Sequence, residues 1–165
     1  MLLATGEQVS VSLMAITMIQ MGVSAVSLNA WQVPMHTTSD YQNARFKRID
    51  TERIRKELDD NKIVIVTGFQ GINKYDDITT LGRGGSDTTA VALAAELHAD
   101  VCEIYTDVDG VYTADPRIVP NARKMEEVTY DEMLEMASAR RKSPSQQMSW
   151  KSQKNTAWNF WSAPV

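Results

Sequence analysis

A glycine-rich stretch around an arginine contains the residue types best suited to binding chemistry. It runs Gly-Arg-Gly-Gly-Ser-Asp from Gly82 to Asp87. Glycines let the backbone approach a ligand closely, and successive N–H groups can form an anion-binding concavity. Arg83 adds a planar guanidinium whose donors match a carboxylate or a phosphate. The pattern favours an anion site over the alternative, a turn whose arginine forms a surface ion pair.

A second polar stretch, Thr106 to Arg117, directly follows an apolar run and contains Asp107, Asp109 and Asp115. Aspartates and an arginine at the edge of a sheet could hold a ribose, a Mg²⁺ ion or a phosphate tail. A solvated acidic loop is the alternative. A calcium loop of the EF-hand type is excluded because the closing Glu and the flanking helices are missing. We therefore favour a nucleotide role for this stretch.

Three other side-chain types attract attention for their chemistry, but their context is weaker. Glu7 immediately precedes a helical pattern, where an acidic residue is usually only a favourable partner of the helix dipole. The two histidines, His36 and His98, and the single Cys102 do not show zinc-ligand spacing. The sequence thus predicts no metal site built from protein ligands alone.

The elements that must position these stretches alternate between helices and strands. Helices are expected over Gln8 to Met21, from Asp50 or Thr51 through Leu58, over Ser86 to Leu97, and over Thr129 to Ala137. Strands are expected over 24–28, 63–66 and 101–105, and residues 29–40 are expected to form a loop. The alternation predicts a three-layer α/β/α sandwich with a mainly parallel sheet. Ligands of such sheets bind at the carboxyl ends of the strands.

Composition narrows the class of partner and the compartment. The net charge of −4 argues against nucleic acid as the main partner. The most apolar stretch, Val9 to Met21, includes polar residues and stops at Gly22, so it is expected to be too short and too polar to span a bilayer. A single cysteine and the lack of a signal-peptide pattern predict a cytoplasmic protein.

The last part of the chain differs in composition from the rest. Residues 140–165 contain five Lys/Arg and no Asp/Glu, whereas the whole chain has 21 Asp/Glu. Reading Trp150-Lys151 and Trp158-Asn159 two bases further on forces a Glu codon at each place. We therefore expect residues 139–165 to be an unrelated basic tail, frameshifted or disordered, with a basic arm for a membrane or partner as the alternative.

Together these motifs resemble the aspartate kinases of the amino-acid kinase superfamily. The resemblance runs in order from about residue 1 to Ala137 and implies that residues 1–138 are part of a catalytic domain. It rests on Gly6-Glu7, Gly68 to Gly71, Leu81 to Ala90, Tyr105 to Arg117 and Tyr130 to Met133.

The resemblance implies an activity and its substrates. Aspartate kinases transfer the γ-phosphoryl group of ATP, with Mg²⁺, to the β-carboxylate of L-aspartate, which gives 4-phospho-L-aspartate. This is the first step toward lysine, threonine and methionine. The carboxylate is already a nucleophile, so catalysis would come from positioning and charge stabilisation.

The resemblance also implies roles for individual residues. Glu7 would hold the amino group of aspartate, Arg83 would pair with its α-carboxylate, and Gly84, Gly85 and Ser86 would lie beside the substrate. Thr106 and Asp107 would border adenine and ribose. Tyr112, Asp115 and Arg117 would lie along the rest of the nucleotide.

The sequence departs from the family's pattern in two places. The family's pattern opens with a Lys-Phe-Gly-Gly-Thr-Ser-type segment, which this sequence does not contain. A Gly-Ala-Lys-Val-Leu-type segment is likewise missing after Ala137. We therefore expect a fragment, incomplete at its N-terminus and inactive alone. Two alternatives stay open: a kinase for glutamate, acetylglutamate, carbamate or UMP, and a non-catalytic partner of an intact kinase. A homo-oligomer or association with an intact subunit is also open.

Overall fold

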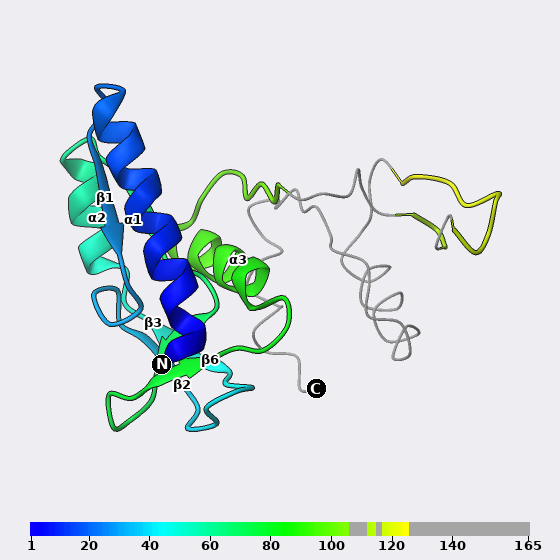
Figure 1. Ribbon diagram of the computed structural model, residues 1–165, viewed down its shortest axis with the longest axis horizontal. Helices are drawn as coiled ribbons and strands as arrows, with labels where there is room; N and C mark the ends of the chain where they lie inside the picture. The colour runs from blue at the N-terminus through cyan, green and yellow to red at the C-terminus, as the bar shows by residue number, and fades with distance from the viewer. Residues whose placement is uncertain (106–111, 115–116, 126–165) are drawn as a thin grey trace. The chain divides into compact units, whose positions relative to one another are not determined.

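The computed structural model describes residues 1–105, 112–114 and 117–125. It divides into two compact units, Met1–Ala99 and Asp100–Val165, and each is treated by itself. All the helices and named strands of the described residues belong to the first unit (Figure 1).

A long helix opens the first unit. The 3-10 turn η1 (Leu2–Ala4) leads into α1 (Thr5–Gln20). At the other end Gly22 adopts φ +81°, and the Val23 N–H donates to the Met18 carbonyl. This left-handed C-terminal turn is the role in which glycine is favoured. The helix predicted from Gln8 is confirmed, but it begins earlier, so Glu7 lies in its first turn.

The earlier start makes this helical stretch longer than the apolar segment Val9 to Met21, which was judged too short to span a bilayer. The helical stretch Leu2–Gln20 has 19 residues and is long and apolar enough to cross a bilayer by length and composition. That criterion is weak evidence, because core helices of soluble proteins and signal sequences also meet it. Several of its large side chains are exposed, among them Val9, Leu13, Ile16 and Ile19.

Two of the predicted strands pair in parallel. Strand β1 (Ala25–Leu28) runs beside β4 (Ile63–Val66), with Val26 opposite Val64 and Leu28 opposite Val66. Val64, Ile65 and Val66 of β4 are half-buried, whereas Ile63 at its start is exposed. Helix α1 covers one face of this pair and α2 (Glu52–Asp59) the other (Figure 1). The α/β layering predicted from the sequence is confirmed.

A second sheet was not predicted. It has four strands in the order β3-β2-β5-β6, formed by β2 (Met35–Thr37), β3 (Phe46–Ile49), β5 (Gln70–Ile72) and β6 (Ile78–Thr80). The β2–β5 pairing is parallel and the other two are antiparallel. Strands of three or four residues are too short to show alternation in a sequence. The expectation of one loop over residues 29–40 is therefore wrong.

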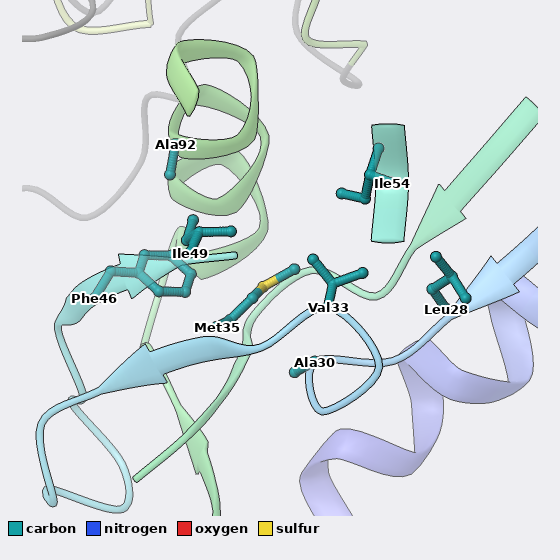
Figure 2. Close-up of a cluster of buried hydrophobic side chains, with 8 residues drawn as sticks. All are labelled: Leu28, Ala30, Val33, Met35, Phe46, Ile49, Ile54 and Ala92. Atoms are coloured by element: carbon teal, nitrogen blue, oxygen red, sulfur yellow. The ribbon is translucent and has the colours of Figure 1, made fainter. Parts of the chain in front are cut away.

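The buried core joins the second sheet to two helices. Figure 2 shows Met35, Phe46 and Ile49 from the sheet beside Ile54 of α2 and Ala92 of α3 (Gly85–Leu97). Leu28, Ala30 and Val33 complete the cluster from the end of β1 and the turn after it. This core holds the base of α3, and hence the glycine-rich stretch before it, against the sheet.

Residues 101–105 do not form the predicted strand. The structure gives them no regular secondary structure, and the Tyr105 side chain is 89% exposed. A strand needs a partner to satisfy its backbone groups, and apolar composition does not supply one. The helix predicted over Thr129 to Ala137 and the tail of residues 139–165 lie outside the described residues.

Candidate functional site

The glycine-rich stretch forms a turn that opens directly into α3. Gly82 and Gly84 adopt φ +81° and +71°, a conformation that side chains with a Cβ atom rarely accept. Gly84 is the N-cap residue, and the helix begins at Gly85. The helix predicted from Ser86 therefore begins one residue earlier, and the Ser86 side chain does not cap it. Unused N–H groups at such a helix start are suited to an anion.

A strained phenylalanine lies under this turn. Phe69 has φ +67°, which is costly for a bulky residue, and its N–H donates to Thr89 Oγ1 of α3 at 3.1 Å. A Cβ atom on Gly85 would lie 2.9 Å from Phe69 Cδ2. Gly85 therefore allows the aromatic ring to pack against the helix start. No role was predicted for Phe69, although the segment Gly68 to Gly71 is part of the pattern that resembles the family.

Arg83 lines an open cavity of about 380 Å³ on the surface. The side chain is exposed, and among the described residues its guanidinium has no ion-pair or hydrogen-bond partner. An arginine held by two glycines without a protein anion is available to bind an external one. The cavity is lined by Leu3, Gln42, Asn43, Phe69, Thr80, Gly82 and Arg83.

The loop before β3 forms one wall of this cavity. Asp40 Oδ1 accepts the N–H groups of Gln42 and Asn43, both at 3.1 Å, and these bonds lower the pKa of the Asp40 carboxyl. The Ala44 N–H donates to the Thr80 carbonyl, and the Thr80 N–H donates to the Tyr41 carbonyl. The loop is thus fastened to the end of β6, just before Gly82. No sequence motif indicates this wall, because Asn43 lies 40 positions before Arg83 in the chain.

Glu7 has an unusual environment for a residue in a first helical turn. Its Oε2 atom is buried and has no hydrogen-bond partner among the described residues. A buried carboxylate oxygen without a donor is costly, so it is a place where a cationic group could be recognised. Glu7 does not line the Arg83 cavity, whose wall from this end of the chain is Leu3.

Ser86 faces a different hollow from Arg83. It lines an apolar cleft of about 370 Å³ between α2, β4 and α3, together with Gly68 and Thr89. A Cβ atom on Gly68 would approach Ser86 Oγ at 3.1 Å, so the serine packs closely on the end of β4. The structure therefore does not bring the Ser86 and Arg83 side chains into one cavity.

The predicted nucleotide residues belong to the second unit, and most lie outside the described residues. This applies to Thr106, Asp107 and Asp115. Tyr112 is half-buried and forms an antiparallel bridge with Lys124. Next to it, the Thr113 N–H donates to the Arg123 carbonyl at 3.0 Å. Arg117 is exposed. Tyr112 is therefore paired with the segment that follows Arg117 in the sequence.

Within residues 1–105, 112–114 and 117–125, no group of three His, Cys, Asp or Glu side chains could hold a metal ion. Mg²⁺ in kinase sites is usually bound by substrate phosphates with one or two carboxylates.

Comparison with known proteins identifies a family that the chain matches. The model of the amino acid kinase family matches residues 1–149. An aspartokinase of Geobacillus stearothermophilus is 59% identical over 138 residues, which is 84% of this chain and 34% of that protein. The chain therefore spans about a third of the length of the curated relatives it matches.

Solved structures show the same likeness. The aspartate kinase from Synechocystis is 48% identical, with a TM-score of 0.68 over 84% of this chain and 22% of that one. Aspartokinase III of E. coli, solved in complex with aspartate and ADP, is 36% identical, with a TM-score of 0.73 over 81% of this chain and 30% of that one.

Proposed function

The chain belongs to the amino acid kinase family, and on that premise we propose that it is part of an aspartate kinase. The observation that carries the proposal is the arginine at position 83. Among the described residues its guanidinium has no partner, and Arg83 lines an open cavity directly before the N-terminus of α3. Both features favour a carboxylate, and the similar E. coli enzyme was solved with aspartate and ADP.

The proposed reaction is transfer of the γ-phosphoryl group of ATP to the β-carboxylate of L-aspartate. The product, 4-phospho-L-aspartate, would enter the synthesis of lysine, threonine and methionine in the cytoplasm. ATP would arrive with Mg²⁺, whose positive charge offsets the negative charge that the phosphates carry. The substrate carboxylate is itself the nucleophile, so this chain's part is to hold and orient it.

Roles follow for the described residues. Arg83 would hold the α-carboxylate with its two parallel donors, and the backbone of Gly84 would lie beside the same anion. The Gly85 N–H instead donates to the Gly82 carbonyl at 3.2 Å and holds the turn in shape. Glu7, whose buried Oε2 has no donor within the part of the chain that the structure describes, would accept the ammonium group. Ser86, which lines the neighbouring cleft, would lie on the side of the phosphates. Thr106, Asp107, Tyr112, Asp115 and Arg117 would hold the nucleotide.

A calorimetric titration with L-aspartate tests the proposal on the 165-residue chain. Arg83→Lys should weaken binding by about tenfold or more, because a lysine keeps the charge but loses the bidentate fork. Arg48→Lys is the matched control, since that side chain lies on β3 beside His36, at 3.3 Å. Equal affinities for the Arg83 and Arg48 variants would overturn the assignment.

The same titration separates the substrates of related kinases. L-aspartate should bind more tightly than glutamate, acetylglutamate or carbamate, and preference for any of these would refute an aspartate site. A phosphorylation assay with ATP and aspartate completes the test. We expect binding without turnover from these 165 residues, because they contain no Lys-Phe-Gly-Gly-Thr-Ser-type segment for the transferring phosphoryl group.

A further inference from the structure

We propose that the Asn43 carboxamide is a second binding group for the carboxylate held by Arg83, and so determines specificity at this site. The inference rests on the proposed function, because it concerns the same cavity and the same end of the substrate. It adds a residue from the loop before β3, which none of the sequence motifs includes.

The first argument is position. Asn43 and Arg83 line one cavity, although they are far apart in sequence. Gly82 lies between them: a Cβ atom built on it would come within 2.7 Å of Asn43 Oδ1. The carboxamide therefore lies directly against the backbone next to Arg83. Any side chain at position 82 would push the carboxamide away, and the positive φ of Gly82 already disfavours one.

The second argument is availability. The backbone N–H of Asn43 is used, since it donates to Asp40, but its side chain is exposed. In the part of the chain that the structure describes, the carboxamide has no hydrogen-bond partner. Within the described residues, an unused amide and an unpaired guanidinium thus line one cavity, and they offer a carboxylate one neutral donor in addition to the charged fork.

The third argument is rigidity. The loop that carries Asn43 is held from both sides, by Asp40 at its start and by backbone bonds to Thr80 at its end. The Thr80 hydroxyl also donates to the Tyr41 carbonyl at 3.1 Å. A ligand-binding group on a fixed loop loses little conformational freedom on binding, and its contribution to affinity is correspondingly larger.

The test compares two ligands on the 165-residue chain. One is L-aspartate, and the other is its α-carboxamide analogue, which lacks the charge that Arg83 and Asn43 share. Asn43→Ala should weaken binding of aspartate by about tenfold and binding of the analogue much less, because a hydrogen bond to a charged group contributes more. A merely structural role would weaken both ligands by the same factor.

A second variant and a control keep the test decisive. Asn43→Asp preserves shape but places an anion beside the carboxylate, so aspartate binding should fall further than in Asn43→Ala. Asn61→Gly is the control. It removes an exposed side-chain amide that lies before the amino end of β4. Asn61 has φ +56°, a conformation that a glycine accepts.

The outcomes separate this inference from the proposed function. If Arg83→Lys weakens aspartate binding and both Asn43 variants bind like the wild-type chain, Asn43 has no role and the aspartate site remains. If equal losses appear for aspartate and its analogue, Asn43 only supports the fold. If the wild-type chain binds no aspartate, both the site and the inference are refuted.

Discussion

The side-chain amide of Gln70 donates a hydrogen bond to the main-chain carbonyl of Ala4 at 2.7 Å, across 66 positions of sequence. Both residues are fully buried. Gln70 also accepts a bond from the Thr67 hydroxyl at 3.2 Å. The glutamine thereby joins the start of α1, which carries Glu7, to the strand that follows Phe69. Two segments of the candidate site are connected by one side chain.

Replacing Gln70 by leucine should destabilise the chain by about 1–3 kcal/mol, because the buried Ala4 carbonyl would lose its donor. Urea denaturation followed by circular dichroism measures the change in the free energy of unfolding. Gln20→Leu, at an exposed position of α1, should change it by less than about 0.5 kcal/mol. Similar losses for the two variants would show that the Gln70 bond adds nothing.

Adjacent threonines on α3 offer a sharper comparison. The buried Thr89 hydroxyl accepts the Phe69 N–H and donates to the Gly85 carbonyl at 2.8 Å. The Thr88 hydroxyl donates only to the Gly84 carbonyl, at an exposed position. Thr89→Val should therefore cost about 1–3 kcal/mol and also weaken aspartate binding, since Phe69 lines the cavity.

Thr88→Val should leave stability and aspartate affinity nearly unchanged, because water can donate to the Gly84 carbonyl in place of the lost Thr88 hydroxyl. The two variants are compared by thermal denaturation and by the calorimetric titration with aspartate. A Thr89→Val chain that is destabilised but binds aspartate normally would contradict a role of the Phe69 turn in the site.

An ion-pair cluster at α2 predicts a pH dependence of stability. Glu57 contacts Arg53 Nη2 and Lys62 Nζ, each at 2.6 Å, and its side chain is only 8% exposed. Hydrogen bonds from Lys62 and then Arg53 lower the pKa of Glu57, and the bond to Glu57 raises the pKa of Lys62. The contribution of Glu57 is complete above the ordinary carboxyl pKa and is lost as pH falls through its lower folded value.

For Lys62 the sign is opposite: its contribution is complete below the ordinary amine pKa and is lost as pH rises through the higher folded value. The stability difference between the wild-type chain and Glu57→Gln should thus be greatest near neutral pH and shrink below about pH 4. A difference that is constant from pH 3 to 7 would exclude the ion pairs as its cause.

Two glycines should respond in opposite directions to alanine. A Cβ atom on Gly71, in β5, would collide with Thr37 Cγ2 and approach the Met35 carbonyl at 3.0 Å. Gly71→Ala should therefore cost about 1–3 kcal/mol or more. A Cβ atom on Gly6, in α1, would meet nothing within 4 Å, so Gly6→Ala should stabilise the chain by about 0.5–1 kcal/mol.

Chemical denaturation of the two alanine variants measures both effects in one experiment. If both variants were more stable than the wild-type chain, backbone entropy, and not the space around Gly71, would decide the outcome.

Patterns that extend over many residues were readable in the sequence. Helix α1 with its Gly22 terminus, the apolar run of β4 and the helix after the glycine-rich turn were all predicted close to where they lie. The second sheet was missed because strands of three or four residues, such as β2, β5 and β6, show no period. Over residues 101–105 the opposite error occurred: their apolar composition predicted a strand that the structure does not form.

The sequence by itself determined the chemical types available at the site: an arginine among glycines, and an acidic residue at the start of a helix. Those properties reside in short contiguous segments, where local backbone preferences act. Only the tertiary structure decided that Asn43 lies against Gly82, that Ser86 faces another cleft, and that the Glu7 oxygen is buried. Such relations depend on which distant segments pack together, and the free energy of packing is a property of the whole fold.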